Sequence, residues 1–245
     1  MQKPQYLHIN YIPEVGWVLS IMSRLLNSAN PQLRSAFDQW SNTPLKELGF
    51  AVTTRMHMLG LCIRRLNARV GELRKEITTD IPGLDACLEK GYAFGTKDTD
   101  LPYELLLDMD AFIFETRSLY EIMGKFLKAL FETLFGRKIE ETELIAVLSD
   151  NKIDTRWIAE LCENRKLFFH QTAPWLAVQV DRETMSLDPI LLKRSTTNFD
   201  PDDVVGFATL REIYEGFVAS VTELHRFIME QITRRESETS PRRAR

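Results

Sequence analysis

Apolar residues recur along most of this chain at steps of three and four positions, the spacing that places side chains on one face of an α-helix. The longest such run extends from Leu45 to Ile77, about nine turns at helical pitch. It predicts a single long helix with a coiled-coil-like apolar seam. Thr43 is the expected N-cap of this helix, with Pro44 at the first helical position.

A second long run, residues 102–135, is apolar on more than one side, because Phe112, Leu119 and Phe126 widen the stripe set by the helical steps. A helix with so broad an apolar surface is expected at the centre of a bundle. Gly136 is expected to end it. Acidic residues along this helix predict a solvated or salt-bridged face: Asp108, Asp110, Glu115 and Glu121.

Shorter segments complete the predicted fold. Further helices are expected over residues 14–28, 33–40, 140–148, 155–170 and 200–233. Glycine and proline interrupt the pattern over residues 79–100, which predicts a connecting loop with one helical turn near residues 84–88. Residues 175–180 and 185–192 are extended in character and can pair as a β-hairpin. The predicted fold class is therefore all-α, a bundle with long antiparallel helices and a small hairpin insertion.

Length and composition fit a globular protein, with 44% hydrophobic and 27% charged residues. We expect an N-terminal helical region over residues 1–100, a helical core over 101–233 and a disordered polar tail over 234–245. The formal net charge of −4 argues against bulk nucleic-acid binding, although not against a local basic cleft. The chain shows neither a signal peptide nor an apolar run long enough to span a membrane, so a soluble, cytoplasmic protein is expected.

Neither a metal nor another cofactor is expected. The chain has no glycine-rich nucleotide fingerprint and no Cys-x-x-Cys pair. Its cysteines are widely spaced in apolar surroundings and predict reduced core residues: Cys62, Cys87 and Cys162. The outer face of the first long helix carries six basic residues: Arg55, Arg64, Arg65, Arg69, Arg74 and Lys75. A solvated face is the favoured interpretation of these residues, with a contact to RNA as the alternative.

Candidate chemistry is concentrated near the end of the helix predicted over residues 155–170, where Arg165 and His170 lie five positions apart. Pro174 predicts that this helix finishes near His170 to Thr172. An arginine fork matches a phosphate oxyanion, and a histidine can accept and donate a proton near neutral pH. On an ideal helix the two side chains are about 140° out of phase. They therefore face one cleft only if the last turn loosens or if a second copy of the chain completes the site.

Arg165, four intervening residues and His170 resemble the R-x4-H motif of HEPN domains, a helical family of nucleotide-binding and ribonuclease proteins. The resemblance covers roughly residues 101–180. The family usually has Asn, Asp or His directly after the arginine, whereas this chain has Lys166 there and Asn164 on the other side. The resemblance implies that Arg165 and His170 are catalytic and that their neighbours bind substrate: Asn164, Lys166 and Gln171. It also implies a supporting polar residue on the preceding long helix, with two candidates: Glu115 and Arg117.

The activity implied by this resemblance is that of a metal-independent endoribonuclease. The ribose 2′-hydroxyl attacks the adjacent phosphodiester and leaves a 2′,3′-cyclic phosphate and a 5′-hydroxyl, so DNA is immune. The resemblance further implies a homodimer that acts on RNA, as a toxin or antiviral effector controlled by an antitoxin or another regulatory protein. Two alternatives remain: a non-catalytic module that binds nucleotide, RNA or a protein, and a structural protein that dimerises through Leu45 to Ile77.

Overall fold

The computed structural model describes residues 16–40, 42–90, 93–170, 175–181, 183–184, 186–192 and 204–239; for residues 166–170 and 239 it describes the backbone alone. This part of the chain forms eight helices and one three-stranded antiparallel sheet, which confirms the prediction of a mostly helical protein with a small β element. The helices are α1 (Gly16–Leu26), α2 (Pro31–Trp40), α3 (Leu45–Thr79), α4 (Ile81–Lys90), α5 (Leu101–Phe135), α6 (Glu141–Asp150), α7 (Arg156–His170) and α8 (Phe207–Thr239). The strands are β1 (Trp175–Asp181), β2 (Ser186–Leu192) and β3 (Val204–Gly206).

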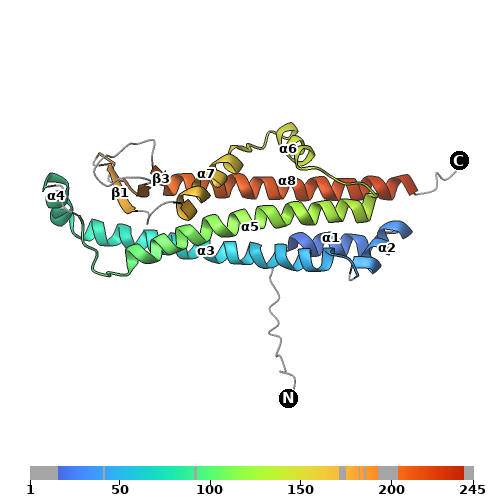
Figure 1. The fold of residues 1–245 in the computed structure, drawn as a ribbon, viewed down its shortest axis with the longest axis horizontal. Helices are drawn as coiled ribbons and strands as arrows, with labels where there is room; N and C mark the ends of the chain where they lie inside the picture. The colour runs from blue at the N-terminus through green and yellow to red at the C-terminus, as the bar shows by residue number, and fades with distance from the viewer. Residues whose placement is uncertain are drawn as a thin grey trace, which may run out of the picture.

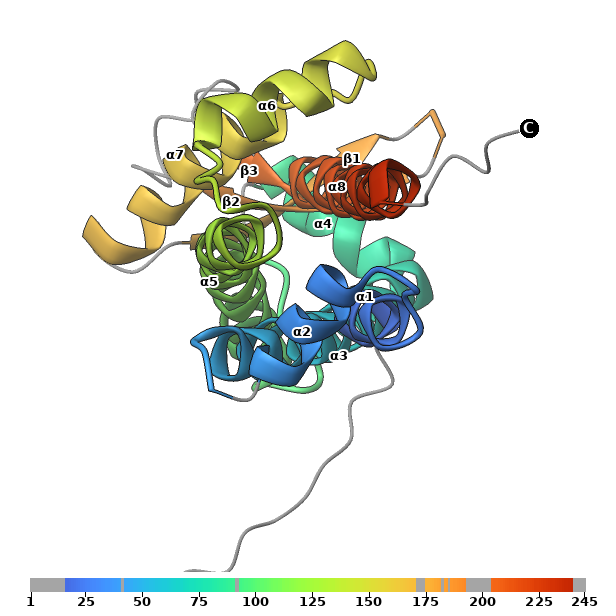
Figure 2. The same ribbon diagram turned by 90° about the vertical axis from the view of Figure 1, so that its right-hand side faces the viewer.

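Three long helices, α3, α5 and α8, run along the long axis of an elongated molecule (Figure 1). The short helices α1 and α2 lie near one end, and α4 lies with the sheet near the other. In the view along that axis, α6 and α7 lie on the side of α5 and α8 that is away from α3 (Figure 2). Of the described helices, none combines the length and the apolar character needed to cross a membrane.

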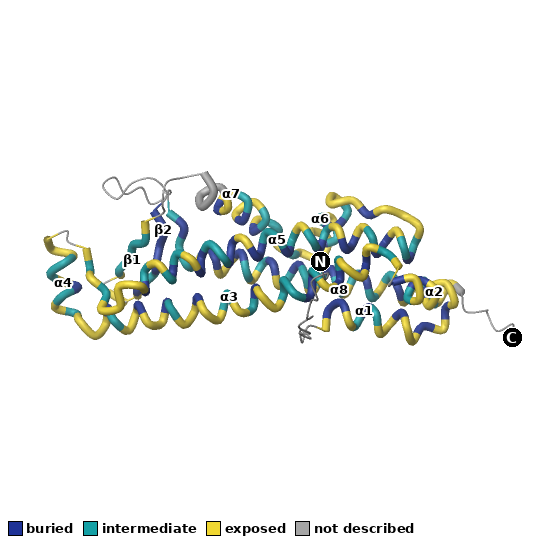
Figure 3. The backbone as a smooth tube through the Cα atoms, turned by 60° about the horizontal axis from the view of Figure 1, so that its bottom comes forward, coloured by how far each residue is buried: buried dark blue, intermediate teal, exposed yellow. Residues whose placement is uncertain are grey.

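The longest apolar seam forms α3, as predicted, and packs along the whole bundle against α5. Buried and exposed residues alternate around α3 with helical period (Figure 3). At the centre of the core, the ring of Phe126 lies 5.8 Å from that of Trp17 and 5.9 Å from that of Trp40. Residues from both sides of the predicted boundary at position 100 share this core. The division of the chain into separate regions stays a prediction.

Ion pairs join α3 to α5. Arg55 contacts Glu115 at 2.7 Å, Arg65 contacts Asp108 at 2.7 Å, and Arg69 contacts Glu104 at 2.6 Å. The residue numbers rise on one helix as they fall on the other, so the two helices are antiparallel. Three of the six basic residues on this face therefore pair with α5: Arg55 and Arg69, which are half-buried, and Arg65, whose side chain stays 64% exposed to solvent. Of the acidic residues predicted on α5 to be solvated or salt-bridged, three form ion pairs: Asp108, Glu115 and Glu121.

Several predicted boundaries hold. Gly136 ends α5 in the left-handed region at φ 63°, and its N–H donates to the carbonyl oxygen of Glu132. The predicted hairpin is present, with β1 and β2 antiparallel from Trp175 opposite Leu192 to Asp181 opposite Ser186. The third strand, β3, was not predicted, because three residues are too few for an alternating pattern to be visible.

Three local predictions are wrong. The Thr43 hydroxyl donates to the carbonyl oxygen of Trp40 at 3.0 Å and does not cap α3, whose N-cap position is Pro44. The segment expected as a loop with one helical turn holds α4, a helix of ten residues.

In addition, residues 234–239 are not a disordered tail but continue α8. Polar contacts to the N-terminal helices stabilise this last part, since Arg235 donates to Gln32 at 3.1 Å and Glu236 pairs with Arg24. Residues 240–245 lie outside the described part of the chain.

A half-buried histidine joins α8 to α1 and is expected to make stability fall in mild acid. His225 Nε2 lies 2.7 Å from Ser20 Oγ, and burial lowers the pKa of His225 below its ordinary value. Because the pKa is lower in the folded state, protonation favours unfolding. This residue costs no stability above its unfolded pKa of about 6.5, and the cost grows as the pH falls below that value. Urea unfolding at pH 7 and pH 5 should therefore show a smaller acid-side loss for His225→Gln than for the wild type.

The matched control for this prediction is His57→Gln, because His57 is exposed on α3. Its loss of stability between the two pH values should equal that of the wild type. An equal loss in all three proteins would show that His225 does not contribute to the pH dependence.

Candidate functional site

The helix that carries the motif, α7, is fixed at its N-terminal half by Trp157. This ring lies edge-on between Tyr120 of α5 and Phe217 of α8, with centroids 5.6 Å away in both cases. Its indole N–H donates to Ser220 Oγ at 3.0 Å. A Cβ on Gly216 would lie 2.5 Å from Trp157 Cδ1, so glycine at this position lets α7 approach α8 closely. These contacts set the orientation of α7 and therefore which residues of the motif face solvent.

The motif begins where α7 passes from packed to exposed residues. Trp157, Leu161 and Asn164, at steps of four and three, are buried on one face. Asn164 is only 2% exposed, and its amide Nδ2 has no hydrogen-bond partner among the described residues. Arg165 follows directly and is exposed. The helix thus presents Arg165 to solvent, while Asn164, expected beside it at the site, faces the interior.

The rest of the motif is described in part. The backbone of α7 continues as helix through Lys166 and ends at His170, within the predicted window. The side chains of Lys166 and His170, and the whole of Gln171, lie outside the described part of the chain. On a regular helix, Arg165 and His170 are separated by about 7.5 Å along the axis and about 140° around it. Because the backbone is helical from Arg165 to His170, the two residues lie on different sides of α7.

Of the two supporting residues implied on α5, Arg117 is the one that contacts α7 within the described part of the chain. It donates to Cys162 Sγ at 3.1 Å and to Glu121 Oε1 at 2.8 Å. Cys162 lies three residues before Arg165, which places the Arg117 guanidinium one turn from the motif arginine. Glu115 pairs instead with Arg55 of α3. Sequence reasoning did not find the link from Arg117 to Cys162, because no local pattern shows which residues of two helices meet.

The cysteines are free and half-buried rather than fully buried in the core: Cys62, Cys87 and Cys162. Burial is the largest cause that raises the pKa of the Cys62 thiol, and Glu115 and Asp108 raise it further. Among the described residues, no group of three or more His, Cys, Asp and Glu side chains is placed to hold a metal ion. No protein-family model, curated protein or solved structure matches the chain, so a function for it follows from its own residues.

Proposed function

We propose that the end of α7 is the active site of a metal-independent endoribonuclease of HEPN type that acts as a homodimer. The observation that supports this proposal is the exposure of Arg165 on a helix whose neighbouring residues, Leu161 and Asn164, are buried. A permanent cation that is presented to solvent near a helix-terminal histidine has the chemistry that phosphodiester cleavage requires.

The reaction needs one proton acceptor, one proton donor and a cation. His170 takes the proton of the ribose 2′-hydroxyl as the 2′-oxygen attacks phosphorus. The bond from phosphorus to the 5′-oxygen breaks, which leaves a 2′,3′-cyclic phosphate, and the departing oxygen takes up a proton to become a 5′-hydroxyl. Arg165 stabilises the negative charge that builds up on the phosphoryl oxygens in the transition state. Lys166 and Gln171 bind the neighbouring phosphate and strand.

The phase of the helix supports a homodimer. Because Arg165 and His170 of one chain are about 140° apart around α7, one reacting phosphate does not contact both within a regular helix. A second copy of the chain, related by a twofold axis, would place its own motif helix beside this one, so that a site can take Arg165 from one copy and His170 from the other. Each of the two sites then holds one Arg165 and one His170, and the imidazolium formed in the first step returns its proton to the departing 5′-oxygen.

The test uses the purified full chain, EDTA and three labelled strands of one sequence: RNA, DNA, and DNA with a single ribonucleotide. The RNA should be cut, the DNA should stay intact, and the third strand should be cut only on the 3′ side of its ribonucleotide. The new ends should be a 2′,3′-cyclic phosphate and a 5′-hydroxyl. RNA that is bound at saturating protein but left intact would favour the non-catalytic module. Expression in bacterial cells should arrest growth if the chain is a toxin.

A further inference from the structure

A cavity of about 320 Å³ lies between α5, α6, α7 and α8, beside Trp157 and apart from the exposed arginine of the motif. Its wall is mostly apolar, with contributions from all four helices: Met123, Leu127, Leu144, Leu148, Ile158 and Phe217. Sites for small molecules range from about 300 to 1,000 Å³. The cavity therefore has room for a small ligand with an apolar body.

The lining also carries charged residues: Arg117, Lys125, Lys128, Glu121 and Glu141. Both carboxylates already have partners in the chain, since Glu121 accepts from Arg117 at 2.8 Å and Glu141 accepts from the Tyr120 hydroxyl. Lys125 is exposed and makes no ion pair within the described part of the chain. Of the three cations, Arg117 pairs with Glu121 and Lys128 pairs with Glu140 at 3.3 Å, so within the described part of the chain Lys125 is the cation left to attract an anionic group.

A glycine in the middle of α5 keeps the cavity open. Gly124 lines it, and a Cβ at this position would meet nothing within 4 Å. Glycine destabilises a helix interior relative to alanine, so neither local helix stability nor packing accounts for its presence here. Gly216, by contrast, is required by the close approach of Trp157. The missing side chain at Gly124 thus leaves empty space that a larger residue would fill.

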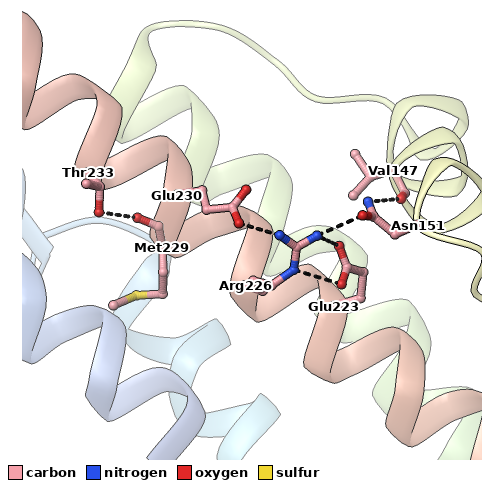
Figure 4. A network of polar contacts seen from close by, with 7 residues as sticks. All are labelled: Val147, Asn151, Glu223, Arg226, Met229, Glu230 and Thr233. Atoms are coloured by element: carbon pink, nitrogen blue, oxygen red, sulfur yellow. Dashed lines mark hydrogen bonds and ion pairs between the residues drawn. The ribbon is translucent and has the colours of Figure 1, made fainter.

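Helix α6 covers the cavity and is attached at both ends. Directly after α6, Asn151 Oδ1 accepts a hydrogen bond of 2.8 Å from Arg226 of α8, which Glu223 and Glu230 flank (Figure 4). At the start of α6, Glu141 accepts from Tyr120 of α5. These polar contacts hold α6 in place over the cavity. They therefore keep α6 from moving inward to close the space beneath it.

We propose that this cavity binds a small amphiphilic carboxylate, with its apolar chain between α5 and α6 and its carboxylate beside Lys125. The volume, the apolar wall and the unpaired cation at the mouth match the three parts of such a ligand: its size, its body and its charge. The site shares Arg117 with the surroundings of the motif but uses neither Arg165 nor His170, so ligand binding can be tested apart from RNA cleavage.

The experiment is a calorimetric titration of the full chain with decanoate, below the concentration at which it forms micelles. Decanol and decyltrimethylammonium serve as neutral and cationic probes of the same apolar chain. We expect saturable binding of one decanoate, weaker binding of decanol and the weakest binding of the cation. Decanoate should also change the fluorescence of Trp157, which lines the cavity.

Two variants that fill the cavity from opposite walls locate the site: Gly124→Leu on α5 and Ile145→Trp on α6. Each should weaken decanoate binding at least about tenfold, which corresponds to about 1.4 kcal/mol. Gly124→Ala adds one methyl group to open space and is the matched control, with affinity close to that of the wild type. Lys125→Glu should weaken decanoate by about two- to fivefold without weakening decanol, because an exposed ion pair contributes little.

Thermal unfolding of each variant establishes that it is folded before it is titrated. His170→Ala should bind decanoate as the wild type does, whether or not the chain cleaves RNA. Unchanged affinity in both cavity-filling variants would overturn the proposal, as would the absence of saturable binding to the wild type. Preference for the cationic probe would overturn the assignment of a carboxylate.

Discussion

Replacement of His170 by alanine is expected to lower the rate of RNA cleavage in EDTA by about 100- to 10,000-fold, the usual contribution of general acid–base catalysis. The imidazole is the group at the end of α7 that can exchange a proton near neutral pH. Cleavage is measured as the single-turnover rate with labelled RNA at saturating protein, which separates the chemical step from binding. Affinity for RNA should change little, because Arg165 and Lys166 keep their charges.

His57→Ala is the matched control, since His57 is an exposed histidine on α3 and lies outside the motif. It should cleave RNA at the rate of the wild type. Arg165→Lys should retain more activity than Arg165→Ala, because lysine keeps the charge but loses the planar fork that matches a phosphate. If His170→Ala and His57→Ala cleave equally fast, His170 is not catalytic and the activity belongs to another site or another protein.

Mixing two inactive variants tests the dimer. Arg165→Ala retains His170, and His170→Ala retains Arg165. If each site takes Arg165 from one copy and His170 from the other, a mixed dimer has two different sites. One site combines the intact Arg165 with the intact His170, and the other combines the two alanines. Half of the dimers are mixed after random exchange of chains, so the mixture should recover about a quarter of the wild-type activity. No recovery, in a mixture shown to exchange chains, would mean that both residues of a site come from the same chain or that the active form is not a dimer.

The long elements of this fold could be predicted because each has a continuous apolar pattern of its own. The seam from Leu45 to Ile77 and the broad stripe of α5 determine both the lengths of the helices and their buried faces. The helix end at His170 could be predicted because Pro174, four residues later, acts through local backbone sterics. These features depend on residues close together in the sequence.

Features that depend on distant residues could not be predicted. The last six residues of α8 are polar, and contacts with residues of α1 and α2 stabilise them as a helix over residues 234–239. The ion pairs of α3 were missed for the same reason, since the carboxylates that accept them lie on α5. At the motif, the sequence does carry a signal for burial: Trp157, Leu161 and Asn164 are spaced as one helical face, which places Asn164 on the buried side.

Glu115, which the family resemblance implies as a support of the motif, instead forms an ion pair with Arg55 of α3. Glu115 is 7% exposed, and both of its carboxylate oxygens accept hydrogen bonds of 2.7 Å from Arg55 Nη1. Removal of one partner of a fully buried pair costs about 3–5 kcal/mol. Since Arg55 remains 28% exposed, Glu115→Ala should lower the free energy of unfolding by less, about 2 kcal/mol. Urea unfolding at pH 7 measures it.

Glu104→Ala is the matched control on the same two helices, because its pair with Arg69 is more exposed. That change should cost less than about 1 kcal/mol. An apolar pair, Arg55→Met with Glu115→Leu, should recover most of the stability, since neither side chain then leaves a buried charge. Equal losses for Glu115→Ala and Glu104→Ala would contradict the argument from burial.

The stable double variant also separates structure from function. If Glu115 stabilises only the contact between α3 and α5, the double variant should cleave RNA at the wild-type rate. If Glu115 supports the motif, as the family resemblance implies, cleavage should fall although the protein is folded. We expect cleavage to be kept, because it is Arg117, and not Glu115, that contacts α7 in the described part of the chain. Arg117→Met should then slow cleavage, since it removes the donor to Cys162 one turn before Arg165.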